Sequence, residues 1–166
     1  MPTKYKTVTD NTTKLIASLQ SLSGKRVEIG ALQGDNKWLA AIHEYGCNIP
    51  VTPKMRAFLH SQGLHLRAET TVIKIPERSF LRAGYDENAD RIMKQTERAL
   101  SLVLAGKMTV DQMLDLCGQQ FATAIKTYMR NLRTPANHPY TVEQKGSSNP
   151  LIDTGGLLES ITWRKV

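Results

Sequence analysis

Residues 109–132, "TVDQMLDLCGQQFATAIKTYMRNL", decide the fold, because their apolar side chains recur with helical spacing over the whole stretch. An apolar residue every three or four positions predicts a single amphipathic helix. Thr109 supplies the hydroxyl that caps its first turn. The predicted helix has about 24 residues and a length of ~36 Å, which is nearly the width of a domain of this size. Its apolar face consists of Val110, Met113, Leu114, Cys117, Phe121, Ile125, Tyr128 and Leu132.

The preceding stretch carries a second apolar series with the same period, and it ends at Gly106. The turn between the two series is short, so the two helices are expected to pack antiparallel as a helical hairpin. The apolar positions of this earlier helix are Ile92, Met93, Thr96, Leu100, Val103 and Leu104.

Four short segments have the character of strands. "KRVEIGAL" (25–32) alternates apolar and polar side chains, and "TTVIKIP" (70–76) is rich in β-branched residues. "CNIPVT" (47–52) contains a proline and predicts a short edge strand, while "ITWRKV" (161–166) predicts a closing strand. The fold class expected is therefore α+β, with a small mixed or antiparallel sheet packed against the long helical hairpin.

Shorter helices are predicted before the hairpin. One begins after a cap at Asp10 or Asn11 and ends at Gly24, and another begins at Pro53, a residue that suits the first turn of a helix. Between them, "KWLAAIHEYG" (37–46) predicts a helix that is capped by Asp35 or Asn36. The apolar face expected for this middle helix is Trp38, Leu39, Ile42 and Tyr45.

The length of 166 residues indicates a single domain spanning 1–166. Residues 1–10 are polar and are expected to form an N-terminal arm. Residues 133–150, "RTPANHPYTVEQKGSSNP", contain three prolines and show no periodicity, which predicts an extended loop. Loops of this length are uncommon in a compact domain unless they have a function or are disordered.

The composition limits the class of protein. The net charge is +7 and the basic residues are scattered, so the charge favours solubility over a nucleic-acid groove; a basic nucleic-acid-binding protein is the alternative from another class. Cys47 and Cys117 are far apart and neither belongs to a CxxC motif, which indicates free thiols in a reducing compartment. The polar N-terminus is unlike a signal peptide, and no apolar run has the ~20 residues that span a bilayer. Synthesis in the cytoplasm without membrane contact is expected.

The run "LIDTG" (151–155) resembles the loop that presents the catalytic carboxylate of an aspartic protease. Such an enzyme needs β-structure around two carboxylates that share a proton. Only 13 residues follow Asp153, and they show helical spacing. Asp153 is therefore predicted to be a helix cap, with Thr154 as its competitor.

Other catalytic and metal-binding motifs are incomplete. "HEYGC" (43–47) lacks the second histidine of a zinc-protease helix, and "GALQGDNK" (30–37) lacks the spacing of a phosphate-binding loop. Cys117 lies on an apolar helix face, where a structural thiol is expected. The sequence predicts a protein that is not an enzyme and has no cofactor or metal.

The segment "IPERSFLRAG" (75–84) has the composition of a protein–protein interface. Arg78, Phe80 and Arg82 alternate after a proline, and arginine and aromatic residues dominate the energetics of many interfaces. A second interpretation remains open, in which Phe80 and Leu81 plug the end of the hairpin and the arginines face water. The proline loop adds Pro135, His138, Tyr140 and Lys145 as candidate partner contacts.

Three segments together resemble the virion-morphogenesis, or tail-component, family of tailed bacteriophages. They are "LAAIHEYG" (39–46), "IPERSFLRAG" (75–84) and "NPLIDTGGLLESI" (149–161), followed by a basic closing strand. Their order matches the family pattern, and with the hairpin they cover nearly all of the chain after residue 25. An insertion of one helix and one strand, residues 47–72, separates the first two segments.

The resemblance implies a structural subunit of the head–tail connection, a neck or tail-completion protein that joins the filled head to the tail. A tail terminator or minor tail protein is the alternative within this class. The implied partners are further copies in a six-fold or twelve-fold homo-oligomeric ring, the neighbouring head-completion or connector protein, and the tail-tube or tail-terminator protein. Genomic DNA in the lumen is a further possible contact. The implied location is the virion, after synthesis in the host cytoplasm, and the family has no catalytic residues.

Overall fold

The structure is a computed structural model that describes residues 12–32 and 34–166. Among these residues no helix combines the length and the apolar character needed to cross a bilayer. The elements in chain order are α1 (Thr12–Leu22), β1 (Val27–Ala31), α2 (Asn36–Tyr45), β2 (Cys47–Pro50), α3 (Pro53–Ser61), β3 (Val72–Ile75), α4 (Leu81–Asp86), α5 (Ala89–Leu104), α6 (Val110–Asn131), α7 (Pro139–Lys145), α8 (Gly156–Ser160) and β4 (Ile161–Lys165).

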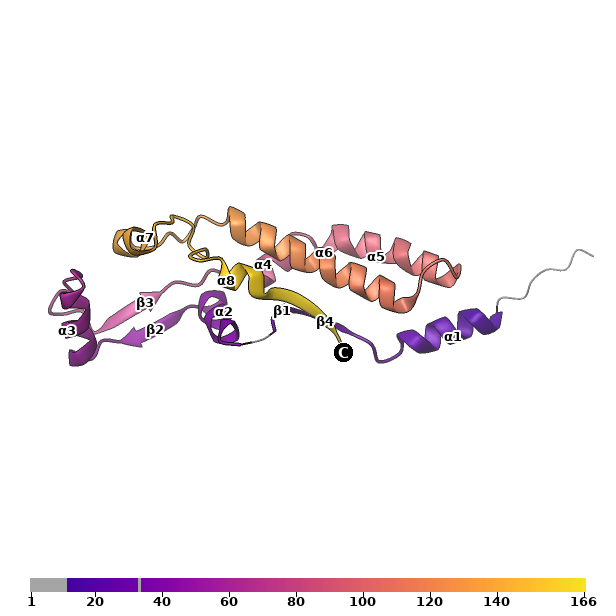
Figure 1. Ribbon diagram of the computed structural model, residues 1–166, viewed down its shortest axis with the longest axis horizontal. Helices are drawn as coiled ribbons and strands as arrows, with labels where there is room; N and C mark the ends of the chain where they lie inside the picture. The colour runs from indigo at the N-terminus through magenta and orange to yellow at the C-terminus, as the bar shows by residue number, and fades with distance from the viewer. Residues whose placement is uncertain (1–11, 33) are drawn as a thin grey trace, which may run out of the picture.

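The predicted α+β class is confirmed, and the strands form two separate antiparallel pairs instead of one small sheet. Strand β1 pairs with β4, with Ile29 opposite Trp163. Strand β2 pairs with β3, with Ile49 opposite Ile73. Figure 1 shows the second pair as a ribbon that leads away from the body of the molecule and carries α3 at its tip.

Helix α6 lies at the centre of the packing. The hydroxyl of Thr109 accepts a hydrogen bond from the Gln112 N–H, and the Gln112 side chain accepts one from the Thr109 N–H, so a complete capping box starts the helix. One part of α6 packs with α5 through buried residues that include Val103 and Met113. The main core lies between α6, α2, α4, α8 and β4, and its buried members are Ala40, Phe80, Ala122, Ile125, Met129, Leu151, Leu157 and Ile161.

The molecule is elongated, with α1 projecting at one end and α3 at the other (Figure 1). Neither helix contains a buried residue. At the α3 tip the Arg56 guanidinium donates hydrogen bonds to the carbonyl oxygens of Leu66, Arg67 and Thr70, at distances of 2.6 to 3.2 Å. The tip is therefore an organised structure that owes little to apolar burial within its own chain.

Several local expectations are wrong. The extended loop predicted over 133–150 contains α7, and residues 81–86, for which no helix was predicted, form the short helix α4. Helix α2 buries Ala40 and Glu44, four residues apart, and turns the predicted apolar residues Trp38 and Tyr45 outward. The predicted cap at Asp10 or Asn11 lies outside the described residues.

Helix α6 lies directly against Trp163 of the β1–β4 sheet at Gly118. A Cβ atom at this position would lie 2.4 Å from Cδ1 of Trp163 on β4. Since the indole is the wide part of Trp163 and lies against the helix backbone, any larger side chain must displace it. Gly118 is therefore required by packing, because its conformation within α6 suits any residue.

Gly118→Ala is expected to destabilise the protein by about 1–3 kcal/mol, the usual cost of overpacking a core. Urea unfolding followed by circular dichroism measures the change. The matched control is Gly156→Ala in α8, where a Cβ atom meets only the Thr154 hydroxyl at 3.6 Å. Equal stability of the wild type and Gly118→Ala would show that Trp163 does not pack as described.

Candidate functional site

Two of the predicted interface residues are buried, and the others lie on or near the surface. Arg78 is 4% exposed and Phe80 is 0% exposed, so both belong to the interior. Their assignment as partner contacts is corrected, because a side chain buried in its own chain is not available to a neighbour. Phe80 belongs to the main core, as in the second interpretation of this segment, whereas Arg78 does not face water.

A buried carboxylate explains why the chain turns Phe80 inward. Glu44, near the end of α2, is 2% exposed and lies at the first turn of α4. Its Oε2 accepts hydrogen bonds from the backbone N–H groups of Phe80 (2.9 Å) and Leu81 (2.8 Å). Its Oε1 accepts from the Ser79 hydroxyl at 2.7 Å and from the Arg82 Nε at 2.9 Å. These bonds satisfy the free N–H groups at the start of α4, a task that no side chain within α4 performs.

The environment keeps Glu44 ionised. Burial raises the pKa of Glu44, but hydrogen bonds from the Leu81 N–H, the Ser79 hydroxyl and Arg82 outweigh burial and hold this pKa below its ordinary value of 4.5. Arg82 also pairs with Glu77 at 2.7 Å. Its guanidinium carbon lies 5.1 Å from the ring centroid of Tyr45, within the range of a cation–π contact.

Arg78 holds the segment between α6 and α7. Its Nε donates to the Pro135 carbonyl at 2.7 Å, and its Nη2 donates to the Ala136 carbonyl at 3.1 Å and to the Asn137 amide oxygen at 2.9 Å. The backbone N–H of Arg78 donates to the His43 carbonyl at 2.7 Å. Burial lowers the pKa of Arg78, and no carboxylate of a described residue lies within 4.0 Å of its guanidinium.

A cavity of about 290 Å³ lies near these Arg78 contacts, between α2, α7 and residues 150–157. His43 lines it from α2 and Lys145 lines it from α7. The Lys145 ammonium donates hydrogen bonds to the carbonyl oxygens of Asn149 and Ile152. The Nδ1 atom of His43 is buried and has no hydrogen-bond partner. His43 and Lys145 therefore both line the cavity, while the Nδ1 atom of His43 is enclosed by the protein itself.

Burial, together with two nearby cations, keeps His43 neutral. Burial lowers the pKa of His43 to about 4, with further contributions from the positive charges of Arg78 and Lys145. Burial also lowers the pKa of Lys145, an effect that the nearby Asp153 carboxylate opposes. At neutral pH the junction therefore holds a neutral imidazole beside two positive charges.

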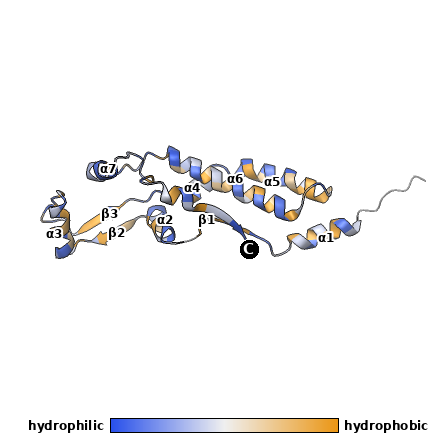
Figure 2. Cartoon of the chain, in the orientation of Figure 1, coloured by the Kyte–Doolittle hydropathy of each residue, from blue (hydrophilic) through white to orange (hydrophobic). Residues whose placement is uncertain are grey.

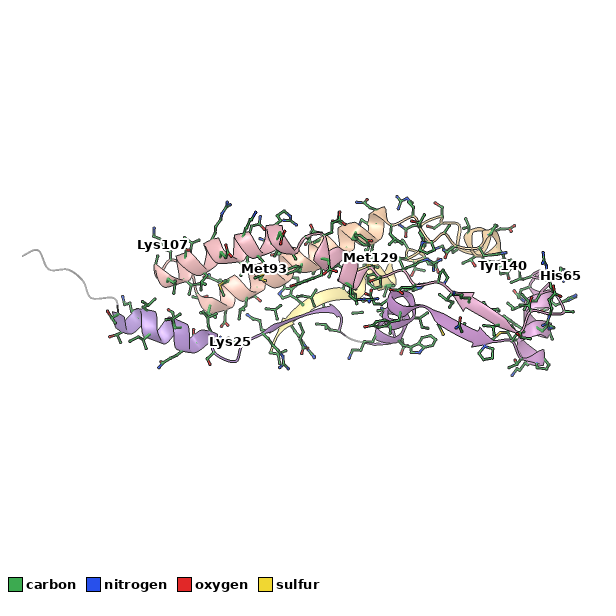
Figure 3. All side chains as sticks on the ribbon, turned by 180° about the vertical axis from the view of Figure 1, so that it is seen from behind. Lys25, His65, Met93, Lys107, Met129 and Tyr140 are labelled. Carbon is green, nitrogen blue, oxygen red and sulfur yellow. The ribbon has the colours of Figure 1, made fainter. Side chains whose placement is uncertain are left out.

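The remaining predicted residues lie on or near the surface of the same junction. Pro135 and His138 are exposed, and the ring nitrogen of His138 accepts a hydrogen bond from the Tyr140 N–H at the start of α7. The Tyr140 hydroxyl donates to the Gln62 carbonyl at 3.2 Å, which ties α7 to the end of α3. Figure 3 shows Tyr140 and His65 at the same end of the molecule.

Asp153 is not the helix cap that the sequence predicted. Helix α8 begins after Gly155, which has φ of 90° and makes no side-chain capping bond. Asp153 is exposed, and the Thr154 hydroxyl makes the local contact by accepting from the Gly156 N–H at 3.4 Å. The left-handed Gly155 moves the start of the helix two residues beyond Asp153, out of reach of its side chain.

A second, larger hollow of about 780 Å³ follows the exposed side of α6 near its C-terminus. Its walls include Gln119, Thr123 and Tyr128 from α6 and Arg91 from α5. No predicted site residue lines it. Among the described residues no group of three or more His, Cys, Asp or Glu side chains is arranged to hold a metal ion.

Glu44 is the site residue that sequence reasoning missed. The sequence analysis includes it in the incomplete zinc-protease motif and in the segment 39–46, without a role of its own. The sequence carries no local signal for its burial, because the burial of Ala40 on the same face of the helix is known only from the structure. A buried carboxylate requires donors, and a helix start without its own cap supplies them.

No protein-family model, curated protein sequence or solved structure matches the chain.

Glu44→Gln is expected to lower the free energy of unfolding by roughly 3 kcal/mol at pH 7, because it removes the buried charge that the α4 N–H groups and Arg82 face. Since the pKa of Glu44 is lowered in the folded state, its contribution is present above pH 4.5 and is lost as the pH falls through the folded value. Urea unfolding between pH 3 and 7 measures both effects. Glu28→Gln, at an exposed ion pair, is the matched control. A Glu44→Gln protein as stable as the wild type would contradict the assignment.

Lys145→Gln is expected to raise the pKa of His43, because it removes one of the two positive charges that disfavour the imidazolium. The titration of the His43 ring by NMR between pH 3.5 and 8 gives this value directly. The wild-type imidazole is expected to stay neutral until about pH 4. An unchanged His43 titration in Lys145→Gln would place the ammonium too far away to act.

Proposed function

We propose that the protein is a structural subunit that works by assembly with further copies of itself, in a ring at the connection between the head and the tail of a bacteriophage. The observation that carries the proposal is the elongated shape, in which large apolar side chains remain exposed on projecting helices. Helix α1 exposes Leu15, Ile16 and Leu19, and helix α3 exposes Phe58. Exposed apolar patches of this kind are typical of surfaces that a partner covers.

The outer face of α2 adds an aromatic patch. Trp38 is 72% exposed and Tyr45 is 68% exposed. They lie seven residues apart, so both side chains are on the same side of the helix. Arg82 extends the patch through its contact with Tyr45. Trp, Tyr and Arg are the residues that most often dominate binding energy at interfaces. This patch replaces the Arg78–Phe80 element as the proposed contact surface.

The proposed subunit has a body and two extensions. The helical hairpin of α5 and α6, with the β1–β4 sheet packed against it, forms the body. Helix α1 and the ribbon tip are the extensions that reach adjacent subunits. The hydropathy colouring in Figure 2 shows apolar residues along the ribbon strands and α1, outside the main core. A ring of six or twelve subunits of the neck or tail-completion type suits this shape, with the connector and the tail tube or its terminator as neighbours.

The ion pairs favour assembly over the alternative of nucleic-acid binding. Lys25 pairs with Asp111, and Lys165 pairs with Asp115, both at 2.8 Å. Arg164 pairs with Glu28 at 2.6 Å. Because Lys25, Arg164 and Lys165 already pair with carboxylates within the chain, these three cations supply little of the free positive surface that phosphate binding requires.

Replacing both Trp38 and Tyr45 with alanine is expected to weaken self-association by at least about 30-fold, because a single hot-spot aromatic contributes about 2 kcal/mol or more. Analytical ultracentrifugation of wild type and variant measures the change. Both side chains are exposed, so the far-UV spectrum of the monomer is expected to be unaltered.

Lys37→Ala is the control, since Lys37 is an exposed neighbour on the same helix. A wild type that stays monomeric at every concentration would contradict the proposal. Equal self-association of the double variant and the wild type would remove the α2 patch from the interface.

A further inference from the structure

We propose that the α3 tip of one copy docks against the outer side of α5 in the next copy, so that neighbouring copies join head to tail. This contact rests on the proposed self-assembly and specifies the two surfaces that meet in it. The α3 tip is the segment of residues 51–71, which connects β2 to β3 and contains α3. The α5 stripe consists of Asp90, Met93, Glu97, Leu100 and Leu104.

The α5 stripe combines apolar side chains with two carboxylates. Its members are spaced alternately three and four residues apart, so their side chains lie along one side of the helix. Met93 is 49% exposed and Leu104 is 42% exposed. Asp90 and Glu97 are exposed, and Leu100 is half-buried. None of the five is among the buried residues of α5, so the stripe remains available to a partner.

The α3 tip presents an aromatic side chain and a cation on its outer side. Phe58 is 61% exposed. Lys54 is exposed and lies one helical turn before Phe58, on the same side of α3. Met55 and Leu59 are half-buried on another side of the helix. Because the hydrogen bonds from Arg56 to the loop carbonyl oxygens organise the tip, its outer side chains are presented by an ordered structure.

The two surfaces carry opposite charges. The α3 tip contains three basic residues and one acidic residue. Residues 86–97, which include the first three members of the stripe, contain four carboxylates and two basic residues. Among the described residues, no ion pair within 4.0 Å involves any of these four carboxylates or the basic residues of the tip. Complementary charge of this kind steers association and fixes the register of an interface.

The places of the two surfaces determine the type of assembly. Figure 1 shows α3 at one end of the long axis and α5 in the hairpin toward the other end. Figure 3 likewise shows His65 at the tip and Met93 far from it on the hairpin. Because the two surfaces are different and far apart, each copy offers its tip to one neighbour and its stripe to another. Such a contact repeats from copy to copy and closes into a ring when the rotation between copies permits.

The experiment reverses the charge of one surface at a time in the full chain. The tip variant is Lys54→Glu with Arg67→Glu, and the stripe variant is Asp90→Lys with Glu97→Lys. Each variant alone is expected to self-associate at least about tenfold more weakly than the wild type, because like charges then meet at every contact. Sedimentation velocity over a concentration series measures the association. An equal mixture of the two variants is expected to recover, because each variant supplies the surface that matches the other.

Two further variants separate the contact from general effects of charge. Asp153→Lys with Glu159→Lys makes the same change in net charge as the stripe variant, at exposed residues outside both surfaces, and is expected to leave self-association unchanged. Phe58→Ala removes the aromatic anchor of the tip and is expected to weaken self-association about tenfold. All the replaced side chains are exposed, so the far-UV circular dichroism of each variant is expected to match that of the wild type.

Recovery of association in the mixture supports the head-to-tail contact. The contact is overturned if the mixture associates no better than its components, or if either variant alone associates like the wild type. A wild type that associates while the mixture fails to recover removes this contact and leaves the proposed assembly in place. A wild type that stays monomeric up to about 1 mM contradicts the proposed assembly, and the contact falls with it.

Discussion

The hydrogen bonds of the Glu44 carboxylate hold the junction of the molecule together. Burying a carboxylate is costly, and the cost is offset only because Ser79, Arg82 and the N–H groups of α4 all donate to it. The same bonds fix the end of α2 against the start of α4. They place Phe80 in the main core and leave Arg78 directed at residues 135–137. The position of the segment before α7, and with it one wall of the cavity, follows from this arrangement.

The junction and the extensions of the molecule differ sharply in how much apolar surface they bury. The junction is dense in hydrogen bonds and buried apolar side chains. By contrast, α1 and α3 bury none of their residues, and α2 exposes Trp38 and Tyr45 on its outer side. A single chain gains little stability from apolar residues placed in this way, whereas an assembly covers them. The basic side chains that are ion-paired within the chain also favour assembly over nucleic-acid binding, because they leave less free positive charge for nucleic acid.

The parts of the fold that could be predicted are those encoded by local periodicity. Helices α5 and α6 follow from apolar spacing, and the four strands follow from β-branched residues and alternation. Helix α7 was missed because it has only seven residues and follows prolines. Asp153 was predicted as a cap from residue type alone, but Gly155 in the left-handed region starts α8 later. The exposure of Trp38 could not be predicted from the sequence of α2, because the helical spacing of its apolar residues is equally compatible with burial of Trp38 against a neighbouring element.

The site itself was only partly predictable. The composition of "IPERSFLRAG" indicated its importance, but the direction of each side chain depends on Glu44, which lies 34 to 38 residues earlier in the sequence. Contacts between distant segments leave no local pattern. The proximity of His43 and Lys145 at the cavity is of the same kind, since they lie 102 positions apart in the chain and the whole helical body lies between them.

The most direct test of the structural role is electron microscopy of particles produced by a phage or prophage that carries this gene, after deletion of the gene. The account predicts filled heads and separate tails that fail to join, with joining restored by the wild-type gene in trans. The length of the tails would then distinguish a terminator from a neck subunit. Normal virions that remain infectious without the gene would contradict the account.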